Sequence, residues 1–182
     1  MQLKVTLSDL FRCTLDREAY ELLAEYPKMV KWWIEKAADF GGGSFAAFRK
    51  KFYQEWKEDW KGYHSQHAQT SCLVAHSSIR LWRGQIERLK GSELKWNFAV
   101  ISPILTRIED GELCFATKIE KTAHVRLIPN SPRQEKLLMQ AENGYWQVGQ
   151  SIVTPKWAVI PFNRYIDLTS EREQIIRELL SN

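Results

Sequence analysis

The sequence predicts an α+β fold, in which an inserted helical bundle interrupts a small antiparallel β-barrel. Residues 1–7 alternate apolar and polar side chains, as is typical of a strand. Apolar residues then recur at helical spacing as far as residue 90, and the period afterwards returns to that of strands. An N-terminal strand needs a partner in a sheet, and the only candidate strands follow the helices. The strands on both sides of the helices should therefore form one barrel.

This arrangement sets the expected domain boundaries. Residues 1–10 and 93–168 should form the barrel, and residues 11–92 should form the helical bundle. Residues 169–182 should form a C-terminal helix or tail, because Ser170 can cap an amphipathic helix with four apolar residues: Ile175, Ile176, Leu179 and Leu180. Small barrels of this kind often bind oligonucleotides through their faces and loops.

The helical part should contain three helices. Thr14 can cap the first, in which Pro27 should introduce a kink or a break. Ser44 follows three glycines and can cap the second helix, and Gly62 should end it or lie just past its end. The third helix should cover about residues 65–90 and carry a single apolar seam, made of Ala68, Cys72, Ala75, Ile79, Trp82 and Ile86.

The part after residue 92 should contain about six short strands and one short helix. A turn at residues 109–111, Glu-Asp-Gly, should join the first two strands as a hairpin. Ser131 followed by Pro132 predicts the start of the helix, and Asn143 followed by Gly144 predicts its end. The expected strands cover residues 96–105, 113–119, 125–128, 146–153, 157–162 and 164–168.

The composition favours a soluble, cytoplasmic protein that does not associate with membranes. Hydrophobic residues make up 44% and charged residues 26%, as in ordinary globular proteins. No apolar run approaches the roughly 20 residues that span a bilayer, and the first ten residues lack the zones of a signal peptide. Three dispersed cysteines argue against a disulfide framework and favour a reducing compartment: Cys13, Cys72 and Cys114.

Positive charge is concentrated in the central helical stretch. Residues 1–92 hold 15 Lys or Arg against 11 Asp or Glu, whereas residues 93–182 hold 11 of each. Between residues 40 and 90 the count is nine against four, which favours a polyanionic partner, although an ordinary solvated helix would carry the same charges. The candidate nucleic-acid-binding residues combine this basic stretch with one arc of the third helix: Arg49, Lys50, Lys51, Gln66, Gln69, His76, Arg80 and Arg83.

The sequence carries no recognisable catalytic motif. It has no phosphate-binding Gly-rich loop, no nucleophile elbow and no HExxH zinc motif. Cys13 or Cys114 would need an adjacent base to act as a nucleophile, and the sequence assigns none. We therefore expect a binding protein without catalytic residues, metal or cofactor.

Two alternatives stay open. A protein-interaction adaptor would use the apolar face of the C-terminal helix or an unpaired edge of the barrel. A small zinc-dependent enzyme would use His64, His67 and His76, with Cys72 nearby on the third helix. Cys72 also belongs to the apolar seam, where a small buried residue is expected.

Four segments, in this order and spacing, resemble the N-terminal half of TnpB, the OrfB-type transposon-encoded RNA-guided DNA nuclease. They are residues 60–69 with the following Ala75, Ser78, Arg80 and Trp82, residues 108–113, residues 132–138 and residues 144–149. The resemblance covers about residues 1–168. It implies a wedge-type barrel interrupted by a helical recognition bundle, and these two parts together hold guide RNA and its heteroduplex with target DNA.

The resemblance also implies that a part is missing. In the family, DNA is cut by a RuvC-like domain with three acidic metal ligands, which begins just after the last barrel strand. Beyond Leu168 this sequence has only residues 169–182, without a Gly-Ile-Asp-type strand. We expect a guide-RNA or DNA-binding module without its own nuclease centre, whether a natural truncated relative, a decayed copy or a fragment. The C-terminal helix should contact a separate nuclease half or another protein.

Overall fold

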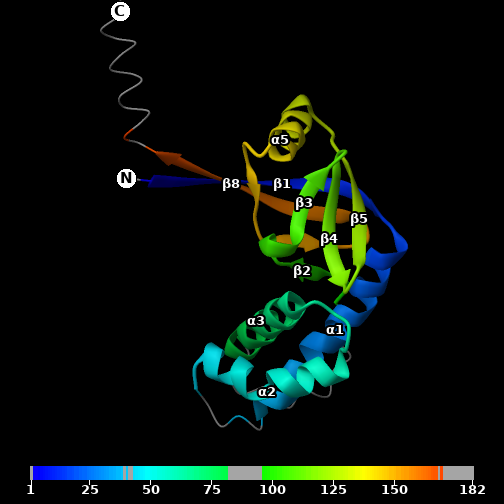
Figure 1. Cartoon of the computed structure of the whole chain (residues 1–182), viewed down its shortest axis with the longest axis vertical. Helices are drawn as coiled ribbons and strands as arrows, with labels where there is room; N and C mark the ends of the chain where they lie inside the picture. Colours follow the sequence, from blue (N-terminus) through cyan, green and yellow to red (C-terminus); the bar gives the residue numbers. More distant parts are fainter. Residues whose placement is uncertain (1, 39, 41–42, 82–95, 168, 170–182) are drawn as a thin grey trace, which may run out of the picture.

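The computed structural model describes residues 2–38, 40, 43–81, 96–167 and 169 (Figure 1). Three helices lie together on one side of a sheet, which confirms the predicted α+β class. The elements in chain order are β1 (Gln2–Leu15), α1 (Arg17–Ala38), α2 (Phe45–Asp59), α3 (Ser65–Leu81), β2 (Ala99–Ile101), the 3-10 helix η1 (Pro103–Leu105), β3 (Thr106–Glu109), β4 (Glu112–Lys118), β5 (Lys121–Ile128), α5 (Pro132–Glu142), β6 (Gln147–Val148), β7 (Ser151–Val153) and β8 (Trp157–Asp167).

The N-terminal strand β1 lies in the middle of the sheet. The strands follow the order β2-β7-β8-β1-β5-β4-β3, with β6 paired to β8, and all pairs are antiparallel. β1 pairs with β8 from Gln2 to Arg12 and with β5 from Arg12 to Leu15. Both partners follow the helices in the sequence, which confirms the prediction that the first strand pairs across the helical segment.

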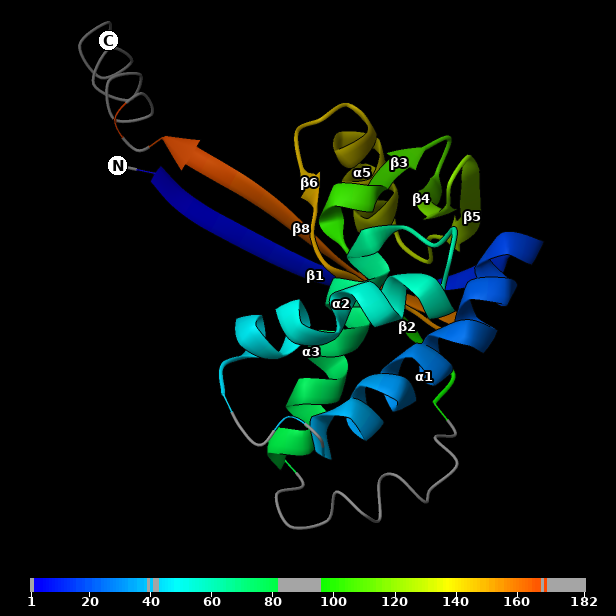
Figure 2. The same cartoon turned by 60° about the horizontal axis from the view of Figure 1, so that its bottom comes forward.

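The sheet is open, so the term barrel is too strong for it. Strands β2 and β3 stand at the two ends of the hydrogen-bonded order, and no pairing between them occurs in the part of the chain that the structure describes. The first part of β1 and the last part of β8 run together away from the rest of the sheet (Figures 1 and 2). The enclosed face of the sheet is apolar and nearly inaccessible to water, with Phe11, Leu113, Phe115, Ile160 and Phe162 as its largest residues.

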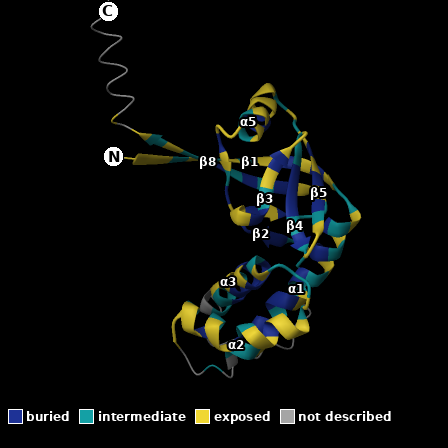
Figure 3. Cartoon of the chain, in the orientation of Figure 1, coloured by how far each residue is buried: buried dark blue, intermediate teal, exposed yellow. Residues whose placement is uncertain are grey.

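Helices α1, α2 and α3 bury their apolar faces against one another (Figure 3). The ring nitrogen of Trp33 in α1 donates to the Ser71 hydroxyl in α3 across 3.1 Å. The predicted seam of α3 is confirmed at Ala68, Cys72 and Ala75, which are fully buried, whereas Ile79 is half-buried. Three further predictions lie outside the described residues. They concern the seam residues Trp82 and Ile86, the end of this helix at residue 90, and the helix expected over residues 170–182.

The start of α1 differs from the prediction. Thr14 pairs with Arg126 and belongs to β1, so it caps no helix. The cap is Asp16, whose Oδ1 accepts a hydrogen bond from the Ala19 amide across 2.8 Å. Pro27 lies inside α1 without ending it. The neighbouring residues Tyr26, Met29 and Val30 are almost completely buried, and this burial offsets the hydrogen bond that proline removes.

The other predicted caps and turns are confirmed. Ser44 caps α2 and accepts from the Ala47 amide, and Gly62 follows the helix with a φ of 98°. Ser131 caps α5, and Gly144 follows its end. The Glu-Asp-Gly turn joins β3 to β4, with positive φ at both Asp110 and Gly111.

Five expected strands have bounds that differ from the structure by more than one residue or are divided or joined. The strand expected over 125–128 begins earlier, at Lys121, and the strand expected over 146–153 is divided into β6 and β7. The strand expected over residues 96–105 is divided into β2 and η1, because Pro103 begins a short 3-10 helix that Ser102 caps. The strands expected over 157–162 and 164–168 form the continuous β8, in which Asn163 pairs with Thr6 of β1. Among the helices that the structure describes, none is long and apolar enough to cross a membrane.

Candidate nucleic-acid interface

An open groove of about 630 Å³ lies between helices α2 and α3. The groove brings together half of the residues that the sequence nominated, namely Arg49, Lys50, Gln66 and Gln69. Its remaining lining residues are Ala46, Tyr53, Gln54 and Ser65. The described lining therefore combines two cations, three amides, a phenol and a hydroxyl, and it contains no carboxylate.

The helical period explains why these side chains gather on one side of α2. Phe48, Phe52 and Trp56 follow one another at intervals of four residues and are buried in the helical core. The groove-lining residues of α2 occupy the neighbouring arc, and most of them are exposed or half-buried. Burial of the aromatic stripe thus directs Arg49 and Lys50 toward α3.

Within the described part of the chain, neither cation of the groove is bound to a carboxylate. Arg49 is half-buried and Lys50 is exposed, and among the described residues no Asp or Glu oxygen lies within 4.0 Å of either. Some cations elsewhere on the surface are paired, as in Arg17 with Glu21 at 2.9 Å, whereas others, such as Lys136, are in no ion pair among the described residues. A phosphate that approaches the groove therefore has no internal ion pair to displace within the described part of the chain.

The side chain of Gln66 is held by Ser102, which lies between β2 and η1. Its Oε1 accepts a hydrogen bond from the Ser102 hydroxyl across 3.1 Å. The same hydroxyl oxygen accepts from the Ile104 amide at the start of η1. This arrangement uses the amide oxygen of Gln66 and leaves its NH₂ group as a donor for a ligand in the groove.

The other four nominated residues are not part of the groove lining. His76 lies farther along α3, with its ring 5.5 Å from that of Phe45. The Lys51 ammonium lies over the Phe52 and Phe40 rings, at 5.0 and 5.7 Å from their centroids, and so belongs to a different face of α2. Arg80 is a residue of α3, but its side chain lies outside the described residues, as does the whole of Arg83.

Four lining residues were not predicted from the sequence, because on α2 only positive charge distinguished the candidates: Ala46, Tyr53, Gln54 and Ser65. Tyr53 follows Lys50 by three residues and Arg49 by four, so it lies on the same helix face. Gln54 follows Lys50 by four residues. Extending the helical spacing from the two cations would have found both, whereas Ala46 and Ser65 give no comparable signal.

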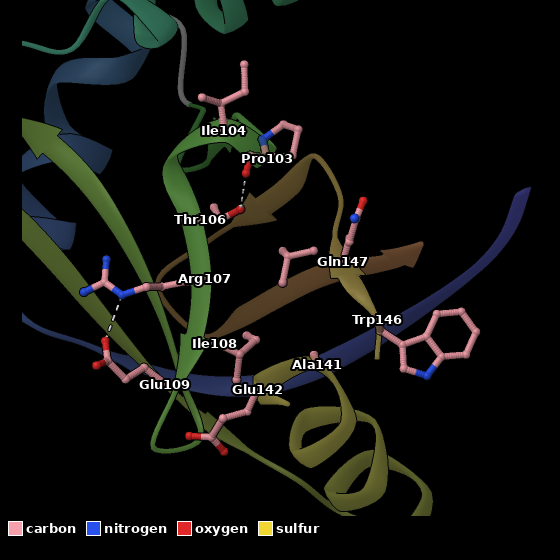
Figure 4. A pocket seen from close by; sticks show the side chains of 11 residues that line it. Pro103, Ile104, Thr106, Arg107, Ile108, Glu109, Ala141, Glu142, Trp146 and Gln147 are labelled. Atoms are coloured by element: carbon pink, nitrogen blue, oxygen red, sulfur yellow. Dashed lines mark hydrogen bonds and ion pairs between the residues drawn. The ribbon is translucent and has the colours of Figure 1, made fainter. Parts of the chain in front are cut away.

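A slightly larger cavity has a different chemistry. It has about 660 Å³ and lies between β3 and the segment that joins α5 to β6 (Figure 4). Its lining includes Glu109 and Glu142, and Arg107 is already bound to Glu109 across 2.8 Å. A phosphate would meet two carboxylates there, so this cavity is less suited to a nucleic acid than the groove.

Two smaller cavities are also less suitable. The one at the α1–α2 contact, of about 440 Å³, is lined by Glu21, Glu25 and Asp59 as well as by lysines. The one beside Pro27, of about 350 Å³, contains Lys28 and Lys31, and Lys28 is bound to Glu25 across 2.6 Å. Of these four cavities, the α2–α3 groove is therefore the best candidate for a polyanion.

The three histidines of the alternative zinc site lie in separate environments. The Nδ1 atom of His64 accepts from the Gln66 amide, and the ring of His76 packs against Phe45. His67 is fully buried and donates from Nε2 to the Ala116 carbonyl across 3.0 Å. Burial raises the pKa of the Cys72 thiol to about 12. In the described residues, the metal-ligating atoms that converge belong to another group: Glu112, Cys114 and His124.

Comparison with known proteins finds an archaeal relative. No protein-family model matches the chain. A protein of Methanocaldococcus jannaschii, named uncharacterized protein MJ0752, is 39% identical to the chain over 61 residues. The matched segment covers 33% of this chain and 80% of the relative. The name of that protein states no function, so the match brings no activity to the chain.

Proposed function

We propose that this chain, which belongs to the same family as the uncharacterized Methanocaldococcus protein, is a nucleic-acid-binding module with the α2–α3 groove as its interface. The observation that carries this proposal is the described lining of the groove, in which two cations without a carboxylate partner lie beside three amides and a phenol. This combination suits a phosphate backbone and its attached bases better than it suits an acidic peptide, which would need cations alone.

Each kind of side chain has a distinct part in the proposed complex. Arg49 and Lys50 bind phosphate oxygens and supply the salt-dependent share of the affinity. Gln66 and Gln69 donate to base edges or sugar hydroxyls. Tyr53 is half-buried at the wall of the groove, and its ring offers a surface on which one base can stack.

The resemblance to TnpB suggests which nucleic acid this is. On that basis we propose that the ligand is a structured guide RNA or its duplex with target DNA, and that this chain binds without cutting. The groove supports a single-stranded or looped segment, because unpaired bases can stack and donate within it. The residues that line the groove belong to the stretch between residues 40 and 90, in which nine Lys or Arg stand against four Asp or Glu.

The decisive experiment removes both groove cations and measures binding as a function of salt. Replacing Arg49 and Lys50 by Ala should weaken binding of a structured RNA and of single-stranded DNA. Each phosphate contact contributes a log–log salt slope of about 0.7–0.9, so the slope should become flatter by roughly one to two.

A matched control removes two positive charges elsewhere. Lys136 on α5 and Lys156 before β8 are exposed, and no ion pair involves them among the described residues. Their replacement by Ala should leave the slope within about half a unit of the parent value. Equal losses in both double variants would mean that only the net charge matters, and the groove would lose its assignment.

An adaptor function is the second candidate, and one feature favours it. Strand β3 stands at one end of the hydrogen-bonded order, and the cavity in Figure 4 runs along it. Ile104, at the mouth of this cavity, exposes 76% of its surface. An extended peptide could add to this strand by main-chain hydrogen bonds. If the parent protein binds no RNA or DNA at low salt, the adaptor proposal replaces the nucleic-acid proposal.

A further inference from the structure

Three potential metal ligands converge on strands β4 and β5, outside the groove. Glu112 and Cys114 are two residues apart on β4, so their side chains lie on the same face of the sheet. His124 on β5 is the direct partner of Cys114 in the antiparallel register. The pairing therefore places a carboxylate, a thiol and an imidazole beside one another, and their ligand atoms all lie within 4.8 Å of one another.

The two separations from the His124 ring nitrogen match those between the ligands of a tetrahedral zinc ion. The Cys114 Sγ lies 3.4 Å from the His124 Nδ1, and the Glu112 Oε2 lies 3.2 Å from the same nitrogen. Ordinary zinc–ligand bond lengths with tetrahedral angles place sulfur and nitrogen about 3.5 Å apart, and nitrogen and oxygen about 3.3 Å apart. The third pair, the Cys114 sulfur and the Glu112 carboxylate, lies within 4.8 Å, so a rotation of the half-buried Glu112 side chain can bring all three atoms to one ion.

The geometry does not fit a catalytic triad. In a triad the nucleophile and the carboxylate use different nitrogens of the histidine ring, so that the ring can relay a proton. Here the Cys114 sulfur and the Glu112 oxygen both face Nδ1. This nitrogen has either one proton or one lone pair, so it cannot form two good hydrogen bonds, whereas a cation can bind all three groups.

The surroundings suit a site with one open position. Cys114 is 1% exposed, whereas His124 and Glu112 reach the surface. The backbone of His124 is fixed by Asp16, whose Oδ2 accepts from the His124 amide across 2.8 Å. On the other edge of β4, Arg107 of β3 is the strand partner of Cys114. The Arg107 guanidinium is bound to the Glu109 carboxylate. Water or a ligand can therefore complete the coordination from the solvent side.

We propose that Glu112, Cys114 and His124 bind a divalent transition-metal ion of the zinc class. On binding, the Cys114 thiol releases its proton to solvent and coordinates as a thiolate. The thiolate and the carboxylate together balance the two charges of the ion. Sulfur and nitrogen ligands select zinc over magnesium or calcium, which prefer oxygen ligands. The site departs from the expectation, drawn from the sequence alone, that the chain holds no metal.

Cobalt titration of the full chain tests this proposal. Co²⁺ should produce a thiolate-to-cobalt charge-transfer band that saturates at one ion per chain, and Zn²⁺ should abolish the band by displacement. Cys114→Ser should lose the band. Cys13→Ser, which alters another buried thiol, should retain it. Absence of the band in the parent protein, or its persistence in Cys114→Ser, would overturn the proposal.

Two variants at the surface keep the test valid if the cysteine variant folds poorly. Glu112→Gln and His124→Gln each remove one ligand from a side chain that reaches solvent. Each should weaken Zn²⁺ binding by about tenfold or more in isothermal titration calorimetry, and each should reduce the rise in melting temperature that Zn²⁺ gives the parent. His64→Gln, at a histidine outside the site, should bind Zn²⁺ like the parent. Unchanged affinity in both ligand variants would also overturn the proposal.

Discussion

His67 is a fully buried histidine whose protonation the folded state strongly opposes. Burial lowers its pKa to about 4, although the hydrogen bond to the Ala116 carbonyl acts in the opposite direction. Its Nδ1 has no hydrogen-bond partner among the described residues. Between pH 6.5, its ordinary pKa, and about pH 4, the residue takes up a proton in the unfolded chain but stays mostly neutral in the folded one. Acid therefore favours unfolding through this residue.

We predict that the free energy of unfolding falls by roughly 3 kcal/mol between pH 7 and pH 4 through His67 alone. Urea denaturation at several pH values measures this loss. His67→Gln keeps a donor for the Ala116 carbonyl but does not titrate, so its stability should depend less steeply on pH across this range. His76→Gln, at a histidine farther along α3, should follow the parent. The same pH dependence in His67→Gln and the parent would contradict the assignment.

Gly149 is a residue whose missing side chain the packing requires. Its amide donates to the Pro161 carbonyl across 2.6 Å, which brings the two backbones close together. A Cβ atom at this position would lie 2.9 Å from the Pro161 Cβ and 2.7 Å from the Asn163 amide nitrogen. We predict that Gly149→Ala destabilises the protein by about 1–3 kcal/mol through overpacking. Gln150→Ala, at the exposed next residue, should change stability by less than about 0.5 kcal/mol in the same denaturation assay.

At the scale of elements, Asp16 joins the end of β1, the start of α1 and β5. Its two carboxylate oxygens accept from the Ala19 amide and from the His124 amide, both across 2.8 Å. Asp16→Ala leaves both donors without this partner. We predict a loss of about 1–3 kcal/mol in the free energy of unfolding, from the lost cap and the lost strand contact.

Thr14→Ala provides the control for this prediction. Thr14 looks equally suitable as a cap in the sequence, but it is exposed on β1 and should contribute less than about 1 kcal/mol. A larger loss from Thr14→Ala than from Asp16→Ala in thermal or urea denaturation would mean that the cap lies at Thr14 after all.

The same pair of residues explains which element boundaries a sequence can predict. Ser44, Ser131 and the Asp110-Gly111 turn were identified correctly, because their effect is local and depends on neighbours in the chain. The boundary between β1 and α1 depends on pairing of Thr14 with Arg126, more than a hundred residues later. Local spacing carries no information about that pairing, so the sequence placed the helix start two residues too early.

At the scale of the whole molecule, the fold class and the pairing of β1 with strands beyond the helices followed from one argument about an unpaired strand. The strand order did not follow from that argument, because β1 pairs with β8 as far as Arg12 and with β5 from Arg12 onward. The sequence also assigned no base to Cys114, although His124 is its direct partner. The position of His124 beside Cys114 depends on the register of the β4–β5 hairpin. A shift of one residue in this register would turn the His124 side chain to the other face of the sheet.

The register of β4 and β5 also decides which metal-ligating side chains lie close together, and their identity bears on whether the chain can cut DNA. Nucleases that use two metal ions need several carboxylates held close together. In the described residues, the group of metal-ligating side chains that converges contains one carboxylate, Glu112, together with a thiol and an imidazole. We therefore predict that the purified chain, with Mg²⁺ or Mn²⁺, does not cut single- or double-stranded DNA. Gel assays over several hours measure this directly. Metal-dependent cutting that survives repurification and disappears when one Asp or Glu is changed would show that the chain holds a nuclease centre.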